Sequence, residues 1–283
     1  MPACRIDELL TRATELAQVS DTARLDLELL LCHVLDKPRS YLFSYPEYEL
    51  TSDQLSQFEQ LFHKRLEGHP IAHLTGVREF WSLELLIEPS TLIPRPDTEC
   101  LVEEALELCD HRPKQVLDLG TGTGAIALAL ASERPGWAVY GCDRVPDAVE
   151  LAKKNAAHNN LERVQFIESS WFQQLPEQSF DLIVSNPPYI IDNDPHLQQG
   201  DVRFEPLSAL TSGADGLDDI RHISSESPHW LRDGGWLMME HGYHQGEDVR
   251  EILASNGFTS IRTVQDLAGH DRITMGQIRS SEI

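Results

Sequence analysis

A glycine-rich turn between a short apolar run and a helical run is the feature that most constrains the fold of this chain. Residues 115–119 predict a buried strand and residues 125–134 predict a helix. The turn between them consists of small residues only, Gly120, Thr121, Gly122, Thr123 and Gly124. Glycines at such a turn let a ligand approach the backbone closely, so we expect a cofactor at the carboxyl end of this strand. Gly120, Gly122 and Ala125 also satisfy the dinucleotide pattern G-x-G-x-x-A, which leaves a nicotinamide-dependent dehydrogenase open.

A carboxylate follows the second predicted strand. Residues 138–142 form that strand, and Asp143 follows it nineteen residues after Gly124. A carboxylate at this position typically accepts hydrogen bonds from both hydroxyls of a ribose. The alternative is that Asp143 caps the helix predicted over residues 145–160.

The third predicted strand, residues 164–168, leads to Ser170 and Trp171. In this arrangement the loop after the third strand lies over an adenine, to which Trp171 offers a flat face and Ser170 a hydroxyl. The alternative is that Trp171 simply packs under the next helix.

The fourth predicted strand ends in the sequence Asn186, Pro187, Pro188 and Tyr189. Open α/β sheets bind their ligands at the carboxyl ends of strands, and these residue types suit the binding of a planar NH2 group. Such a nitrogen shares its lone pair with a π-system and attacks poorly unless acceptors draw its hydrogens aside. The Asn186 side-chain oxygen and the Pro187 carbonyl are two such acceptors on a stiff backbone, and Tyr189 covers the flat face of the substrate. The alternative is an ordinary Asn-Pro turn after a strand.

Strands and helices alternate to the end of the chain. Further strands are predicted over residues 236–240, 258–264 and 273–278, and helices over 217–230 and 245–256. This order predicts a mostly parallel sheet with an antiparallel edge. The long polar stretch over residues 192–216 contains Arg203 and Phe204, which suggests part of a substrate channel.

The N-terminal part of the chain has a different pattern. Residues 7–19, 22–35 and 52–67 repeat apolar side chains at helical spacing, which predicts a small helical bundle. Over residues 78–93 the period changes to two, with a corner at residues 88–90, so we expect a β-hairpin that links two domains. Residues 94–99 form either a proline-stiffened linker with ordinary helix capping or the rim of an active site.

Composition limits the partners and the compartment. The formal net charge is −23, of which residues 1–76 carry −5, and this acidity argues against a duplex-binding enzyme. The five cysteines form no Cys-x-x-Cys pair, which favours a reducing cytoplasm and argues against zinc. His69 and His73 have helical spacing but no companion carboxylate motif, so we predict no metal site. The start of the chain, Met1 to Arg5, does not lead into a signal peptide, and no apolar run is long enough for a membrane span.

Together the glycine turn, Asp143 and the Asn-Pro-Pro-Tyr sequence resemble the class I S-adenosylmethionine-dependent methyltransferases. More narrowly, residues 76–82, 92–99 and 200–206 make the chain similar to the bacterial peptide chain release factor glutamine methyltransferases, the HemK/PrmC family. One departure is Ser170, which stands where that family often has an acidic residue.

The resemblance implies an α/β fold with a Rossmann-like, seven-stranded class I methyltransferase sheet. It divides the chain into a helical substrate-docking domain at residues 1–75, a β-hairpin linker at 76–95 and a methyltransferase domain at 96–283. The implied substrates are release factors, methylated on the side-chain nitrogen (N5) of the glutamine in their Gly-Gly-Gln motif. S-adenosylmethionine is the implied methyl donor and S-adenosylhomocysteine the product.

The implied roles fall on the motifs already described. The predicted cofactor-binding residues are Gly120, Thr121, Gly122, Thr123, Gly124, Asp143, Trp171 and Asn186. The predicted catalytic residues are Asn186, Pro187 and Tyr189, and these three bind the substrate together with Pro188. An adenine-N6 nucleic-acid methyltransferase remains an alternative, because an aromatic amine poses the same geometric problem. A cofactor-binding regulator without catalysis is a further alternative.

Overall fold

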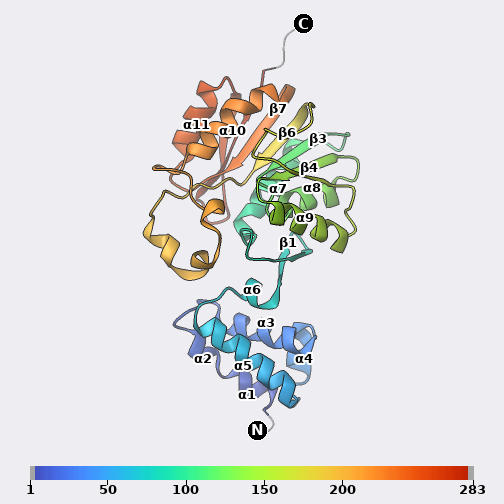
Figure 1. The fold of residues 1–283 in the computed structure, drawn as a ribbon, viewed down its shortest axis with the longest axis vertical. Coiled ribbons are helices and arrows are strands. Elements are labelled where there is room, and N and C mark those ends of the chain that lie inside the picture. The colour runs from blue at the N-terminus through green and yellow to red at the C-terminus, as the bar shows by residue number, and fades with distance from the viewer. Residues whose placement is uncertain (1–3, 280–283) are drawn as a thin grey trace. The chain divides into compact units, whose positions relative to one another are not determined.

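The computed structural model describes residues 4–279 (Figure 1). Residues 1–3 and 280–283 lie outside this range. The prediction that the chain start does not lead into a signal peptide rests partly on the first three of them. The chain forms two compact units. The helical unit comprises Met1–Val77 and Pro195–Phe204, and the sheet unit comprises Arg78–Asp194 and Glu205–Ile283.

The helical unit contains the predicted bundle, in which two long helices carry most of the core. These are α3 (Ala23–Leu35) and α5 (Ser52–Leu66). Thr51 begins α5 in a capping box with Gln54, because each side chain binds the backbone N–H of the other residue. The apolar faces of both helices are buried in one cluster that includes Leu27, Leu31, Phe58 and Phe62.

The single helix predicted over residues 7–19 is wrong. The chain there forms two short helices, α1 (Ile6–Leu10) and α2 (Ala13–Leu16), separated by a tight turn at Thr11 and Arg12. Two further short helices, α4 (Arg39–Ser44) and α6 (Ile71–Thr75), were not predicted. Each follows a proline, whose fixed φ suits the start of a helix, but their lengths of six and five residues are too short to show periodicity.

A β-hairpin is present, but its turn lies elsewhere than the predicted corner. Strand β1 (Val77–Phe80) pairs with β2 (Leu83–Leu86) through Trp81 and Ser82, which both have positive φ. Two consecutive positive φ values characterise the tight turns that glycine and asparagine usually form, so the sequence did not reveal this one. Residues 88–93, where we expected the hairpin corner, contain no strand.

The predicted seven-stranded sheet is confirmed within residues 4–279, in the order β5-β4-β3-β6-β7-β9-β8. Its strands are β3 (Gln115–Leu119), β4 (Ala138–Asp143), β5 (Gln165–Glu168), β6 (Phe180–Ser185), β7 (Leu231–Glu240), β8 (Thr259–Gln265) and β9 (Asp271–Gln277). Strands β3 to β7 are parallel, whereas β9 runs antiparallel to both β7 and β8. The antiparallel edge is therefore also confirmed.

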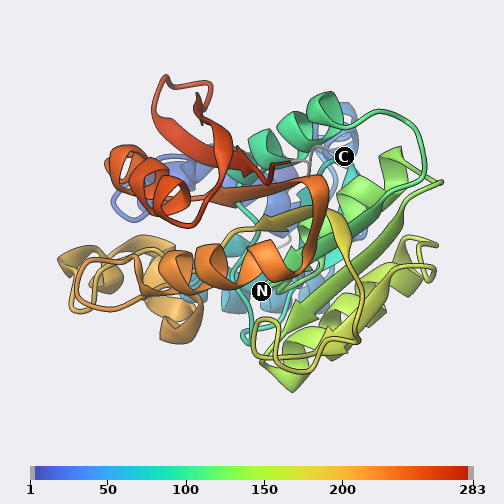
Figure 2. The ribbon, with the colours of Figure 1, turned by 90° about the horizontal axis from the view of Figure 1, so that it is seen from above.

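Helices cover both faces of this sheet (Figure 2). Leu117, Ile183 and Leu237 pack in one cluster with apolar residues of α10 (Asp218–Glu226) and α11 (Gly246–Ser255). Alternate residues of the same strands, such as Val116 and Leu182, are also fully buried. The remaining long helices are α7 (Glu99–Leu108), α8 (Ala125–Glu133) and α9 (Pro146–His158). Burial on both faces explains the apolar runs of the parallel strands.

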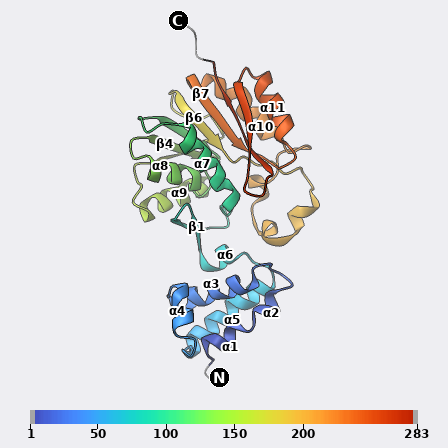
Figure 3. The ribbon, with the colours of Figure 1, turned by 180° about the vertical axis from the view of Figure 1, so that it is seen from behind.

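The long segment between β6 and α10 folds into three short 3-10 helices (Figure 3). These are Pro195–Gln198, Gly200–Phe204 and Leu207–Ala209. At the base of the segment, Ile190 and Thr211 form an isolated bridge. Arg203 donates to the carbonyl of Glu67 at 2.6 Å, and the Phe204 ring lies 4.3 Å from that of His69. The structure thus places these two side chains within the helical unit, against the end of α5, and their part in a substrate channel stays a prediction.

Candidate functional site

The glycine turn after β3 forms the floor of a cavity in the sheet unit. Gly120, Gly122 and Gly124 all have positive φ, and Gly124 is the residue from which α8 begins. A Cβ atom added to Gly124 would lie 3.1 Å from Phe166 Cζ and 3.2 Å from Ala152 Cβ. Backbone conformation and close packing therefore both require glycine at this position.

Asp143, at the end of β4, binds this turn. Its Oδ2 accepts a hydrogen bond from Gly122 N at 3.0 Å, and its Oδ1 accepts one from Val145 N at 2.9 Å. Burial raises the pKa of Asp143, and the backbone donors of Val145 and Gly122 oppose that rise. The carboxylate thus lines the cavity, as the ribose role requires, and also binds the start of the chain leading into α9, as the capping alternative requires.

A second carboxylate, Asp118 on β3, lies beneath the turn and was not among the predicted site residues. Its Oδ2 accepts hydrogen bonds from Thr121 Oγ1 at 2.6 Å and Ala127 N at 3.3 Å. Its Oδ1 is buried and has no hydrogen-bond partner among the described residues. Burial is the main reason that the pKa of Asp118 is raised to about 7. Asp118 therefore anchors the turn through Thr121 and α8.

Trp171 forms one wall of the cavity. It has a positive φ, and its carbonyl accepts a hydrogen bond from Ser169 Oγ at 2.7 Å. A Cβ atom added to Gly120 would lie 3.3 Å from Trp171 Cζ3, so the indole stands against the glycine turn. Ser169 lines the cavity with Trp171, whereas Ser170, the residue we expected there, is not among the lining residues.

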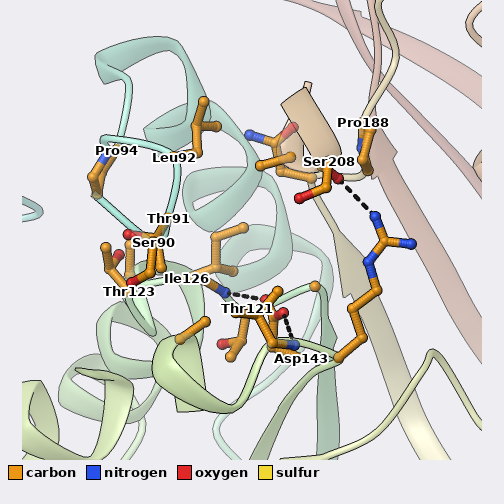
Figure 4. Close-up of a pocket in the computed structure, with 18 of the residues that line it drawn as sticks. Ser90, Thr91, Leu92, Pro94, Thr121, Thr123, Ile126, Asp143, Pro188 and Ser208 are labelled. Carbon is orange, nitrogen blue, oxygen red and sulfur yellow. Dashed lines mark hydrogen bonds between the residues drawn. The ribbon is translucent and has the colours of Figure 1, made fainter. Parts of the chain in front are cut away.

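The cavity, drawn in Figure 4, has a volume of about 920 Å³ when the space open to solvent is included. Eight predicted residues line it: Gly120, Thr121, Gly122, Thr123, Asp143, Trp171, Asn186 and Pro188. Gly124, Pro187 and Tyr189 are not among the lining residues. The turn of β3 and the end of β6 thus meet at one cavity, because adjacent parallel strands end at the same edge of the sheet.

The rim of the cavity comes from two segments that the sequence left ambiguous. One rim contains Ser90, Thr91, Leu92, Pro94, Arg95 and Thr98, which favours the rim interpretation of residues 94–99. The buried Glu205 holds this rim, since it accepts hydrogen bonds from Ile93 N at 2.9 Å and Arg95 Nη2 at 2.5 Å. The other rim contains Ser208, whose carbonyl accepts a hydrogen bond from Arg144 at 3.0 Å (Figure 4).

Behind Asn186 lies a hydrogen-bonded chain of polar side chains. Asn186 Nδ2 donates to Thr98 Oγ1 at 3.2 Å, and Thr98 Oγ1 donates to Glu240 Oε2 at 2.7 Å. The other carboxylate oxygen of Glu240 accepts a hydrogen bond from the Tyr189 hydroxyl at 3.1 Å. Burial raises the pKa of Glu240, and the Thr98 hydroxyl and the charge of Arg272 oppose that rise. Burial, and after it the charge of Glu240, raises the pKa of Tyr189.

The sequence interpretation missed Glu240, and it placed Thr98 within residues 94–99 either at the start of a helix or on the rim of an active site. Thr98 forms no side-chain cap and uses its hydroxyl in the chain behind Asn186 instead. Glu240 could have been found from its position, since it is a carboxylate at the carboxyl end of an otherwise apolar strand. Strand β7 pairs with β6, which places Glu240 beside Asn186.

His241, next to Glu240, stabilises the end of β7 in its neutral form. Its buried ring contacts the Gly242 carbonyl through Nδ1 at 2.9 Å and Thr274 Oγ1 through Nε2 at 2.8 Å. A carbonyl only accepts, so Nδ1 carries the proton and Nε2 accepts from the threonine. Burial lowers the pKa of His241.

A histidine with a lowered pKa makes the stability of the folded protein depend on pH. Its contribution is complete above the unfolded pKa of about 6.5 and is lost as the pH falls from there to the lower folded pKa. We therefore expect His241→Gln to reduce the free energy of unfolding more at about pH 8 than at about pH 5.5. Denaturant unfolding of both proteins at the two pH values measures this, and a pH-independent difference would contradict it.

None of the helices within residues 4–279 is long and apolar enough to cross a membrane. The five cysteines are free thiols.

Comparison with known proteins gives consistent matches over both units. Residues 8–76 match the PrmC N-terminal domain family, and residues 97–201 match the Methyltransferase small domain family. The chain is 55% identical over 278 residues to the release factor glutamine methyltransferase of Vibrio cholerae serotype O1, covering 97% of each protein. It is 51% identical over 268 residues to the release factor glutamine methyltransferase of Escherichia coli strain K12, covering 95% of this chain and 97% of that one. A solved methyltransferase structure from Pyrococcus furiosus shares the fold, with a TM-score of 0.54 at 17% identity, covering 81% of this chain and 100% of that one.

Proposed function

The chain belongs to the release factor glutamine methyltransferase family, and from this membership we propose that it methylates the side-chain amide nitrogen of a release factor glutamine, with S-adenosylmethionine as donor. The observation that carries the proposal is the cavity in which the glycine turn, Asp143 and Asn186 lie together. A methyl donor bound at the glycine turn and a planar nitrogen bound at Asn186 would lie next to each other, because the parallel strands β3 and β6 end side by side at the same edge of the sheet.

The residues that line the cavity fit S-adenosylmethionine. Asp143 supplies a carboxylate for the ribose hydroxyls, and Trp171 supplies a flat apolar wall for the adenine. The glycine turn leaves its backbone open to the ligand, since an atom added at Gly122 finds its nearest neighbour at 3.9 Å. When bound, this cofactor supplies a methyl group activated on a sulfonium.

The protein mainly orients the acceptor nitrogen and excludes water, which is a proximity effect. Asn186 Oδ1 and the Pro187 carbonyl accept the two hydrogens of the glutamine amide and stabilise the positive charge that grows on its nitrogen. The proton leaves to solvent or to these acceptors after transfer. Tyr189, whose hydroxyl is held by Glu240, covers the flat face of the amide.

We assign recognition of the release factor to the helical domain, residues 1–75, which matches the PrmC N-terminal domain family over most of its length. We expect the glutamine to be the one in the Gly-Gly-Gln motif. The net charge of −23 argues against the adenine-N6 nucleic-acid alternative, because phosphate contacts require basic side chains. The free thiols suit a reducing compartment, so we expect a cytoplasmic enzyme.

The test is mass spectrometry of a purified release factor incubated with the enzyme and S-adenosylmethionine. We expect a one-methyl mass increase localised to the glutamine of the Gly-Gly-Gln motif. An unmodified glutamine under conditions in which the enzyme binds S-adenosylmethionine would refute the proposed substrate. Methylation of adenine in an oligonucleotide would favour the alternative.

Asp143→Ala tests the cofactor assignment. We expect the affinity for S-adenosylmethionine to fall by about 10–100-fold, since hydrogen bonds to a charged group contribute about 1.5–3 kcal/mol. Titration calorimetry measures the affinity directly. Asp147→Ala is the matched control, because this exposed aspartate lies in the first turn of α9 and does not line the cavity. Equal affinities of the two variants would remove Asp143 from the cofactor site.

A further inference from the structure

The side chain of Glu240 is the starting point, because it is buried and its carboxylate is hydrogen-bonded by two hydroxyl groups among the described residues. It is 1% exposed and accepts hydrogen bonds from Thr98 and Tyr189. Burying a carboxylate costs free energy relative to an apolar side chain, and the two neutral donors and the charge of Arg272 offset part of that cost, so its presence requires an explanation. The proposed function gives Glu240 only the task of holding the Tyr189 hydroxyl and does not explain its contact with Thr98.

Glu240 can influence Asn186 through Thr98, because the Thr98 hydroxyl has a single proton to donate. In its ionised form the Glu240 carboxylate only accepts, so Thr98 donates its single proton to Glu240 at 2.7 Å. Thr98 Oγ1 is then left with lone pairs, and the group 3.2 Å away on Asn186 must be the donating NH2 end of the amide. The two ends of an asparagine amide have nearly the same size, so packing alone does not select between them.

We propose that Glu240 is a positioning residue that fixes the orientation of the Asn186 amide through Thr98, so that the amide oxygen faces the cavity. The proposal rests on the proposed function, because a glutamine NH2 group needs an acceptor at that point. With the amide reversed, the NH2 group of Asn186 would oppose the NH2 group of the substrate. Glu240 thus determines which end of Asn186 is presented, although it touches neither substrate nor cofactor.

The isosteric change Glu240→Gln gives the first test. The new amide donates to Thr98 and still accepts from Tyr189, so the Thr98 hydroxyl turns its proton to Asn186 and favours the reversed amide. We expect kcat to fall by about tenfold or more, as for a lost hydrogen bond to a charged group, with the affinity for S-adenosylmethionine unchanged. Glu103→Gln is the matched control, since this exposed residue of α7 makes the same chemical change away from the cavity.

A second test reverses the donors and acceptors along the hydrogen bonds from Glu240 through Thr98 to Asn186. It separates a positioning role of Glu240 from a merely structural one. In Asn186→Asp, a carboxylate oxygen faces Thr98, whose proton is already donated to Glu240, so two acceptors oppose each other. In the double variant Asn186→Asp with Glu240→Gln, the glutamine donates to Thr98 and Thr98 donates to the new carboxylate. We therefore expect the double variant to turn over about tenfold faster than Asn186→Asp alone.

The outcomes are distinguishable from those that test the proposed function. If the wild-type enzyme does not methylate a release factor, the proposed function fails, and the positioning role of Glu240 that rests on it is refuted with it. If the wild type is active and Glu240→Gln retains its kcat, or the double variant is no faster than Asn186→Asp, the positioning role is refuted. Calorimetry with S-adenosylmethionine shows that each variant is folded, so a loss of turnover with retained binding and the recovery in the double variant support the proposal.

Discussion

Asn186→Ala is expected to lower kcat for release factor methylation by about 10²–10³-fold, the usual effect of removing one preorganised polar group from a transition-state site. Its side-chain oxygen is the proposed acceptor that aligns the glutamine nitrogen and stabilises the charge that develops on it. The affinity for S-adenosylmethionine should remain close to wild type, because the glycine turn and Asp143 stay in place. Single-turnover mass spectrometry at saturating cofactor measures the rate, and calorimetry measures binding.

Asn256→Ala provides the control for this prediction. Asn256 lies in the same unit at the end of α11, where its Nδ2 donates to the carbonyl of Ile252, and it is not part of the cavity. Its replacement should leave the rate unchanged. Methylation by Asn186→Ala at a rate near that of the wild type would show that another group aligns the glutamine.

Arg65→Ala is expected to destabilise the helical unit by about 3–5 kcal/mol, because it leaves a buried charge without its partner. Arg65 Nε donates to Asp26 Oδ2 at 2.7 Å, and both side chains are 6% exposed. Arg65 Nη1 also donates to the carbonyl of His69 at 3.0 Å and to Asp201 at 3.3 Å. One side chain therefore joins α3, the end of α5 and the segment Pro195–Phe204. Denaturant unfolding followed by circular dichroism measures the loss.

Two further variants make this prediction specific. Arg5→Ala removes an ion pair with Asp7 whose side chains are 35% and 43% exposed, so we expect a much smaller loss of stability than in Arg65→Ala. The double change Asp26→Leu with Arg65→Met removes both buried charges and should recover much of the stability lost in Arg65→Ala. A loss in Arg65→Ala no larger than in Arg5→Ala would show that the buried pair contributes little.

The sequence by itself determined the sheet and most of the cavity. Apolar strands, the glycine turn and Asp143 are local features, and parallel strands bring their carboxyl ends to one edge whatever the details of packing. That is why Gly120, Asp143, Trp171 and Asn186 could be predicted as one site. The same reasoning predicted the antiparallel edge formed by the last two strands, since they follow each other without a helix between them.

Tertiary structure alone decided features that depend on contacts between distant residues. The hairpin turn uses positive φ at Trp81 and Ser82, which neither residue favours locally. Arg203 and Phe204 have partners more than 130 positions away in the sequence, on the end of α5 and beside it. Their placement in the helical unit depends on these contacts, which no periodic pattern records.

The hydrogen-bonded side chains behind Asn186 show most clearly what the sequence could not predict. Thr98 and Glu240 are 142 positions apart and become neighbours only because the rim segment and β7 meet beside β6. A hydroxyl has one proton to donate, so its role follows from which acceptor the fold places next to it. The residue types of the sequence thus predicted that Asn186 faces a substrate nitrogen, whereas only the folded arrangement brings its Nδ2 to Thr98 and Thr98 to Glu240.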